Sequence, residues 1–242
     1  MQTLAGQHAL VSGGGTGIGL ACAWALTQAG AHVTILGRRE APLAAAVAAG
    51  AAAEMVVADA VRPPQLPACS ILINAAGAAA SAPFLRTEDD DFRQSIEANL
   101  MSAVALTRAI LPAMLAARSG RIVNIASTAA LKGYAYVAPY VAAKHALLGF
   151  TRALALEVAA KGVTVNAICP GFTETPLLAR SIERITALTG RDDAGARTEL
   201  AQNNPQARLL DPGEIAALAV FLCTEAARGI HGAALSISGG EV

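Results

Sequence analysis

Short runs of apolar, often β-branched residues alternate along the chain with longer stretches rich in alanine and leucine. The short runs are typical of strands that are buried on both faces, and the longer stretches have the apolar spacing of amphipathic helices. Strands are predicted at His8–Ser12, His32–Leu36, Glu54–Ala58, Ser70–Asn74, Arg121–Ala126, Thr164–Ile168 and Ala234–Ile237. Helices are predicted at Gly17–Ala29, Ala41–Ala49, Asp90–Ala117, Pro139–Lys161 and Pro212–Thr224.

This alternation predicts a parallel sheet with helices on both faces, because each crossover between parallel strands places a helix on one side. Right-handed crossovers then give a doubly wound, Rossmann-like α/β fold of about seven strands. No repeat, charge block or Gly/Ser-rich linker divides the chain, so we expect residues 1–242 to form a single domain. A ligand of such a fold binds in the crevice at the carboxyl ends of the strands.

Two segments depart from the pattern. Only residues 60–69 separate the third predicted strand from the fourth, and they contain three prolines. Since proline breaks helices, we expect an extended or single-turn crossover there, leaving part of one sheet face uncovered or covered by a partner. Residues 172–206 mix charges with glycine and have weak helical periodicity, and we expect them to form a substrate lid.

The composition argues against several classes of partner. Lys plus Arg and Asp plus Glu number 18 each, so no excess of basic charge points to nucleic acid or anionic lipid. No uninterrupted apolar run reaches the roughly 20 residues of a membrane span. Residues Met1 to Gly6 lack the basic and apolar segments of a secretory signal. We therefore expect a cytoplasmic protein that binds neither membranes nor nucleic acid.

The cysteines and histidines show no metal-ligand spacing. The four cysteines are far apart, and the four histidines are equally scattered. This pattern favours reduced, buried thiols and no metal site. The cysteines are Cys22, Cys69, Cys169 and Cys223.

A glycine-rich loop follows the first predicted strand and leads into a helix. Small residues let such a backbone approach a pyrophosphate, which the free N–H groups of the helix N-terminus stabilise. The spacing is G-x-x-x-G-x-G, and a turn without a ligand is the alternative, but the position between strand and helix favours a dinucleotide. The residues expected to contact it are Gly13, Gly15, Thr16, Gly17, Ile18 and Gly19.

The end of the second predicted strand bears on the choice of nicotinamide cofactor. An acidic residue there would bind the hydroxyls of the adenosine ribose, but this chain has Arg38 and Arg39. A guanidinium suits the 2′-phosphate, so NADP(H) is favoured and NAD(H) remains possible. The alternative is that the two arginines are a solvated cap on the next helix.

Tyr140 and Lys144 lie four residues apart, on one face of a predicted helix. A lysine cation beside a phenol favours the phenolate and lowers the tyrosine pKa, so Tyr140 could exchange a proton with an alcohol or a carbonyl. Such a pair is also common on exposed helices. Ser127, directly after a predicted strand, could hydrogen-bond the substrate oxygen or cap a turn. Asn99 lies inside a predicted helix, where a solvated face is the simpler interpretation.

The order and spacing of these motifs, with Asn74-Ala75-Ala76-Gly77 and Pro170-Gly171, closely resemble the short-chain dehydrogenase/reductase family over essentially the whole chain. The resemblance implies that Asn99, Ser127, Tyr140 and Lys144 form the catalytic tetrad. Tyr140 would be the general acid/base, and Ser127 would steady the substrate oxygen. Lys144 would bind the nicotinamide ribose and lower the tyrosine pKa, and Asn99 would hold a water of a proton relay.

The same resemblance implies further cofactor contacts and an assembly. Asp59 and Asn74 would bind the adenine side, and Ala75 and Gly77 would line the central crevice. Pro170, Gly171 and Thr173 would bracket the nicotinamide. The resemblance also implies a homotetramer or homodimer that packs through the helices carrying Asn99 and Tyr140, with residues 147–156 at the interface or packed on the sheet.

The tetrad predicts an NAD(P)-dependent oxidoreductase that interconverts a secondary alcohol and a ketone, acting on a small molecule. The run Ala129–Val137 is similar to bacterial members that act on 3-hydroxyacyl or 3-oxoacyl thioesters, and lid arginines could bind an anionic carrier. Those arginines are Arg180, Arg184, Arg191 and Arg197. The alternative substrates are small cyclic, aromatic or polyol ketones. A non-catalytic dinucleotide sensor is a remote alternative, because such a protein would be expected to have lost Tyr140 or Lys144.

Overall fold

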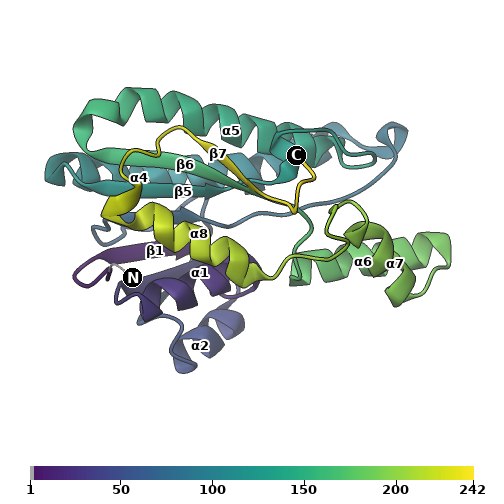
Figure 1. Ribbon diagram of the computed structural model, residues 1–242, viewed down its shortest axis with the longest axis horizontal. Coiled ribbons are helices and arrows are strands. Elements are labelled where there is room, and N and C mark those ends of the chain that lie inside the picture. The colour runs from purple at the N-terminus through teal and green to yellow at the C-terminus, as the bar shows by residue number, and fades with distance from the viewer. Residues whose placement is uncertain (1–2) are drawn as a thin grey trace.

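The computed structural model describes residues 3–242, which form one layer of sheet between two layers of helices (Figure 1). All seven strands of the sheet are parallel, in the order β3-β2-β1-β4-β5-β6-β7, which confirms the doubly wound α/β prediction. Strands β1 to β3 are added toward one edge of the sheet and strands β4 to β7 toward the other. The switch point between β1 and β4 opens a crevice at the carboxyl ends of the strands. The strands are β1 (His8–Ser12), β2 (His32–Gly37), β3 (Glu54–Val57), β4 (Ile71–Asn74), β5 (Gly120–Ile125), β6 (Val163–Pro170) and β7 (Ala234–Ile237).

Each face of the sheet has its own apolar core. Val11 and Ile35 face one core, under α1, α2 and α8, whereas Leu10 and Leu72 face the other, under α4 and α5. The central strands are buried except for His8 at the start of β1, as their largely apolar runs predict. The helices are α1 (Gly17–Gln28), α2 (Glu40–Ala48), α3 (Asp89–Ile96), α4 (Ser102–Ala117), α5 (Ala138–Val158), α6 (Pro176–Thr189), α7 (Asp193–Ala201) and α8 (Pro212–Cys223).

The crossover from β3 to β4 contains a turn but no helix, as the prolines predict. Leu66 and Ala60 of this segment pack against the second core and cover part of the sheet. Strand β3 is an edge strand, and Met55 and Val57 are 36% and 49% exposed. The sheet is therefore only partly covered at this end, as expected.

The lid is more ordered than its weak periodicity indicates, because α6 and α7 account for most of it. These two helices pack on one another through a small core of their own, built on Leu178, Ile182 and Ala196. Figure 1 shows them projecting beyond the carboxyl end of the sheet. Each helix buries its apolar face against the other and not against the sheet.

The long helix predicted at Asp90–Ala117 is interrupted. A π-helical segment, Glu97–Met101, separates α3 from α4. The stretch Asp89–Ala117 is long and apolar enough to cross a membrane by length and composition alone, a test that core helices also pass. Its Leu106, Ile110 and Met114 pack against the sheet, as in a core helix.

Two smaller expectations can be compared with the fold. The cysteines at positions 22, 69, 169 and 223 are free and buried, as predicted. Within residues 147–156, Leu147, Leu148 and Leu154 are buried in the cores, whereas Leu156 is 84% exposed. Most of this stretch therefore packs on the sheet within the chain.

Candidate active site

The glycine loop is held tightly between β1 and α1. Gly13 and Gly17 have φ values of 66° and 56°, which favour glycine. A Cβ at Gly19 would collide with the carbonyl oxygen of Gly13, and one at Gly13 would lie 3.0 Å from the carbonyl oxygen of Ala75. The Ser12 hydroxyl accepts hydrogen bonds from the N–H groups of Ala75 and Ala76, each at 3.1 Å. The loop is thus held in one conformation, and no side chains cover the backbone at its glycines, as a pyrophosphate site requires.

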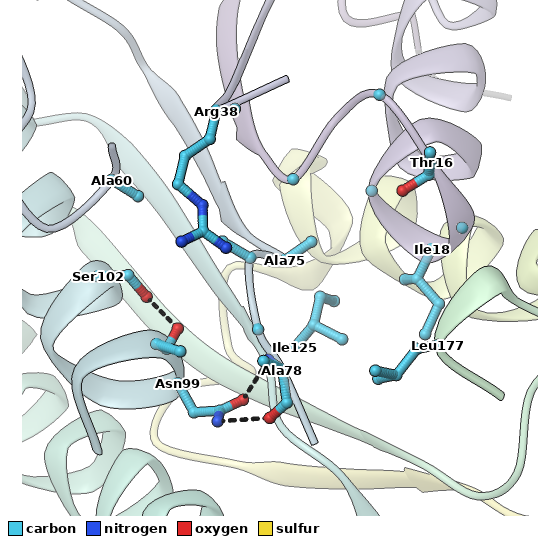
Figure 2. Close-up of a pocket in the computed structure, with 18 of the residues that line it drawn as sticks. Thr16, Ile18, Arg38, Ala60, Ala75, Ala78, Asn99, Ser102, Ile125 and Leu177 are labelled. Atoms are coloured by element: carbon cyan, nitrogen blue, oxygen red, sulfur yellow. Dashed lines mark hydrogen bonds between the residues drawn. The ribbon is translucent and has the colours of Figure 1, made fainter. Parts of the chain in front are cut away.

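A cavity of about 870 Å³ extends from this loop along the carboxyl ends of the strands. Gly13, Arg38 and Asp59 line one part of it, and Tyr140 and Lys144 line the other. Figure 2 shows the Arg38 side chain extending from the end of β2 into the pocket. An elongated cavity with a bare glycine loop, a guanidinium and a phenol beside an amine fits a dinucleotide that carries a 2′-phosphate.

The structure brings most of the expected cofactor residues to this cavity. Asn74 is different, because it is 3% exposed and its Nδ2 donates to Asn124 Oδ1 at 2.8 Å, inside the core. Three further residues, as well as Ser127, are absent from the cavity lining in the described part of the chain: Pro170, Gly171 and Thr173. The expected residues that line the cavity are Gly13, Gly15, Thr16, Gly17, Ile18, Gly19, Arg38, Arg39, Asp59, Ala75, Gly77, Asn99, Tyr140 and Lys144.

Asn99 lies in the π-helical segment and is 1% exposed, so a solvated helix face is the wrong interpretation. Its Nδ2 donates to the carbonyl oxygen of Ser95 at 3.0 Å. Figure 2 shows its two bonds with Ala78, in which Nδ2 donates to the carbonyl oxygen at 2.8 Å and Oδ1 accepts from the N–H at 3.4 Å. The extra residue of a π turn pushes a side chain out of the regular helical register, and such turns are frequent at functional sites. Here Asn99 supports the backbone at Gly77 and Ala78, on the wall of the cavity.

Tyr140 and Lys144 project from α5 into the inner end of the cavity. Lys144 is 4% exposed, its Nζ donates to the carbonyl oxygen of Ile125 at 2.9 Å, and it lies 5.6 Å from the centre of the Tyr140 ring. Burial lowers the pKa of Lys144 to about 8, and Cys169 opposes this shift. Lysine 144 is therefore a poorly solvated amine that is held in place by the end of β5.

The expectation that Lys144 lowers the pKa of Tyr140 is not met by this geometry. Burial raises the pKa of Tyr140, and only a hydrogen bond with Ser127 opposes that shift. The Lys144 amine lies over the ring and donates to a backbone carbonyl, and no hydrogen bond joins it to the phenol oxygen among the described residues. A raised pKa keeps the phenol protonated near neutral pH, which suits a proton donor.

Ser127 both caps a turn and lies where it could bind the substrate oxygen, the two roles that its sequence position indicates. It is the N-cap of a short 3₁₀ turn, Thr128–Ala130, where its Oγ accepts from the N–H of Ala129 at 3.1 Å. It also hydrogen-bonds Tyr140. The two hydroxyls are therefore close enough to bind the same substrate oxygen.

The N-terminus of α6 contributes cavity residues that the sequence interpretation missed: Thr175, Pro176, Leu177 and Arg180. Thr175 is the N-cap of α6, and a Cβ at Gly17 would lie 3.2 Å from its Cγ2. The lid therefore begins directly over the glycine loop. The pair Thr175-Pro176 is a typical helix start, so it could have revealed this element.

The lid arginines differ in their surroundings. Arg197 is held by ion pairs with Glu174 and Asp193, and Arg191 pairs with Glu199. Arg180 is exposed and is the lid arginine that lines the cavity.

Comparisons with known proteins agree with this geometry. The family model for short chain dehydrogenases matches residues 7–185. The chain is 39% identical to a D-beta-hydroxybutyrate dehydrogenase of Cupriavidus necator, over 99% of each protein. It is 35% identical to a 3-oxoacyl-(acyl-carrier-protein) reductase of Vibrio harveyi, over 98% of each. The structure of an actinorhodin polyketide ketoreductase with NADPH superposes with a TM-score of 0.92 at 32% identity, over 97% of each chain.

The cavity, the buried amine, the half-buried phenol and these similarities lead to one conclusion. NADP(H) is the favoured cofactor, in agreement with Arg38 in the pocket and with the NADPH in the similar ketoreductase structure. The chain belongs to the short-chain dehydrogenase/reductase family and is an NAD(P)-dependent oxidoreductase that interconverts a secondary alcohol and a ketone.

Proposed function

We propose that the protein reduces a 3-oxoacyl thioester with NADPH, and that Tyr140 donates the proton to the ketone oxygen. The observation that carries the proposal is the half-buried phenol of Tyr140, which is hydrogen-bonded to Ser127 and has a raised pKa. A protonated phenol beside a second hydroxyl can bind a ketone oxygen and neutralise the charge that develops on it. When bound, the reduced nicotinamide supplies the hydride.

The other residues of the tetrad hold this centre in place. Ser127 steadies the ketone oxygen through its hydroxyl, and Lys144 binds the nicotinamide ribose from the floor of the cavity. Asn99 holds the backbone at Ala78 and a water of the proton relay. On the cofactor side, we assign Asp59 and the glycine loop to the adenosine and pyrophosphate.

Two observations favour a thioester over a small ketone. Arg180, on the lid, lines the cavity and has an exposed guanidinium, which suits the phosphates of a carrier such as coenzyme A. The relative from Vibrio harveyi is a 3-oxoacyl-(acyl-carrier-protein) reductase. The run Ala129–Val137 also resembles bacterial members that act on 3-hydroxyacyl or 3-oxoacyl thioesters. Leu156 is exposed on α5, which fits packing in a homodimer or homotetramer. We also expect the protein to be cytoplasmic.

A panel of acetoacetyl thioesters and cyclic or polyol ketones, assayed with NADPH and NADH in parallel, tests the substrate class and the cofactor. Turnover is measured as the loss of absorbance of the reduced nicotinamide. We expect the highest kcat/KM with the thioester and NADPH. Thioester turnover no faster than the enzyme-free control, together with turnover of a cyclic ketone, would replace the substrate assignment and leave the reaction type intact.

Tyr140→Phe tests the chemistry itself and separates an enzyme from a dinucleotide sensor. The variant keeps the ring and loses the proton, so kcat is expected to fall at least about a hundredfold while NADPH binding, measured by fluorescence, persists. If the variant turned over like the parent protein, the role of Tyr140 would have to be abandoned.

A further inference from the structure

The penultimate residue of the chain, Glu241, has a buried side chain, with only 2% of it exposed. Figure 1 shows the C-terminus at the carboxyl end of the sheet, on the side of the lid helices. A buried carboxylate is costly unless it is paired and hydrogen-bonded, so its position calls for specific partners.

The route of the tail brings it against the end of the lid. Gly239 has a φ of 64°, and a Cβ there would collide with the side chain of Asn204. Gly240 has a φ of 98° and lies against Pro205, where a Cβ would come within 3.7 Å of the ring. Asn204 is itself buried, and its Nδ2 donates to the carbonyl oxygen of Arg208 at 2.8 Å. The tail therefore follows one defined path, which leads to Glu241.

The carboxylate of Glu241 joins the loop after Ser127 to the root of the lid. Its Oε1 accepts a short hydrogen bond from the hydroxyl of Tyr134 and pairs with Lys132 Nζ at 3.0 Å. Its Oε2 has no hydrogen-bond partner in the described part of the chain and faces Gly171, where a Cβ would lie 3.1 Å away. The carboxylate thus contacts the backbone at the point where the lid begins.

Tyr134 extends this contact toward the reacting groups. Its hydroxyl lies 2.6 Å from Thr128 Oγ1, next in the chain to Ser127, and its ring meets that of Phe172 edge to face at 5.9 Å. Burial and the bond to Glu241 raise the pKa of Tyr134, which keeps its hydroxyl protonated. Tyr134 is also close enough to Tyr140 for the two phenols to interact electrostatically.

We propose that Glu241 is a positioning residue that holds Tyr134 and Phe172 together as one wall of the substrate pocket. Ser127 begins the segment that carries the first of them and Gly171 begins the segment that carries the second, and the contacts of Glu241 fix the spacing of these two segments. This role rests on the proposed function, because it needs Ser127 and Tyr140 as the reacting centre. It sets substrate affinity and selectivity, and it leaves the cofactor end of the cavity unaffected.

The test compares Glu241→Ala, Glu241→Gln and Tyr134→Phe with a control, Glu183→Gln, on the exposed face of the lid. We expect Glu241→Ala and Tyr134→Phe each to raise the KM for the ketone about tenfold, with the KM for NADPH unchanged, as one charge-assisted hydrogen bond would contribute. The double variant Glu241→Ala/Tyr134→Phe should have a KM for the ketone no higher than that of the more affected single variant, because both substitutions remove the same contact. Glu241→Gln still accepts from Tyr134, so its KM should rise less than about threefold.

The parent protein gives the reference for every outcome. If it is active and all three variants keep the control's KM, the positioning role of Glu241 is wrong and the proposed function stands. A lower melting temperature with an unchanged KM would show that the tail only stabilises the fold. If the parent reduces no ketone of the panel, the proposed function fails first. Should Glu241→Ala not fold, Tyr134→Phe and Glu241→Gln decide the matter.

Discussion

Replacing Lys144 by methionine, which has a similar length and no charge, is expected to stabilise the fold at pH 7 and to abolish turnover. Lys144 is 4% exposed, and burial lowers its pKa from 10.5 to about 8. The unfolded chain therefore holds the proton more tightly than the folded one. Below pH 8 the full free-energy cost of burying this charged lysine opposes folding. The cost disappears as the pH rises through about 10.5.

The size of the effect follows from the difference in pKa. Burying the charge costs about 3 kcal/mol at neutral pH, by the conversion of about 1.4 kcal/mol for each pKa unit. Methionine also loses the hydrogen bond from Nζ to the carbonyl oxygen of Ile125, which is 2.9 Å long and contributes about 1 kcal/mol. The net gain of about 2 kcal/mol corresponds to a melting temperature that is higher by about 4–8 °C in a chain of this size.

Urea unfolding of the parent protein and of Lys144→Met at pH 7, 8.5 and 10 measures this difference. The stability advantage of the variant should shrink with rising pH and be nearly gone at pH 10, where the penalty falls below about 1 kcal/mol. The exposed Lys161→Met serves as the control and should change stability little at any of the three values. An advantage that does not depend on pH, or a variant less stable than the parent at pH 7, would refute the reasoning.

Three further substitutions test the cofactor pocket. Arg38→Ala should raise the KM for NADPH about tenfold and leave that for NADH unchanged, whereas the nearby Arg62→Ala should change neither, which steady-state kinetics with both cofactors would show. Asn99→Ala removes two good hydrogen bonds but places a better helix former there, so the free energy of unfolding should fall by about 1–2 kcal/mol. Its kcat should fall at least about tenfold, because the backbone of Ala78 loses its support. Gly19→Ala places a methyl group against the carbonyl oxygen of the first loop glycine, and calorimetry should show a lower melting temperature and weaker NADPH binding.

The strands and the inner end of the site could be predicted because their signals are local. Buried parallel strands are largely apolar, so most of the run Val163–Pro170, which includes the polar Thr164 and Asn166, is recognisable without knowledge of its neighbours. Tyr140 and Lys144 lie on one turn of helix, and Ser127 follows a strand, so sheet topology brings them to one edge. The missing helix between β3 and β4 was visible in the proline content.

Other features depend on contacts between distant parts of the chain. The helices α6 and α7 bury Ile182 and Ala196 against each other, and the sequence does not reveal that these two segments pack together. Tyr134 and Glu241 meet across 107 positions, and no local pattern indicates that contact. Asn74, implied as a cofactor residue by resemblance, donates to Asn124 in the core. The pKa of Tyr140 depends on burial, which a spacing of four residues does not reveal.

The shortened crossover after β3 also bears on how the protein avoids association through its sheet. An exposed edge strand offers free N–H and C=O groups to which a strand of another molecule could pair. Here β3 has only four residues, begins with the charged Glu54, and is followed by a segment whose prolines lack the N–H needed to extend a ladder. The chain thus keeps this edge to four residues and follows it with a segment that cannot lengthen the ladder, without a helix to cover it.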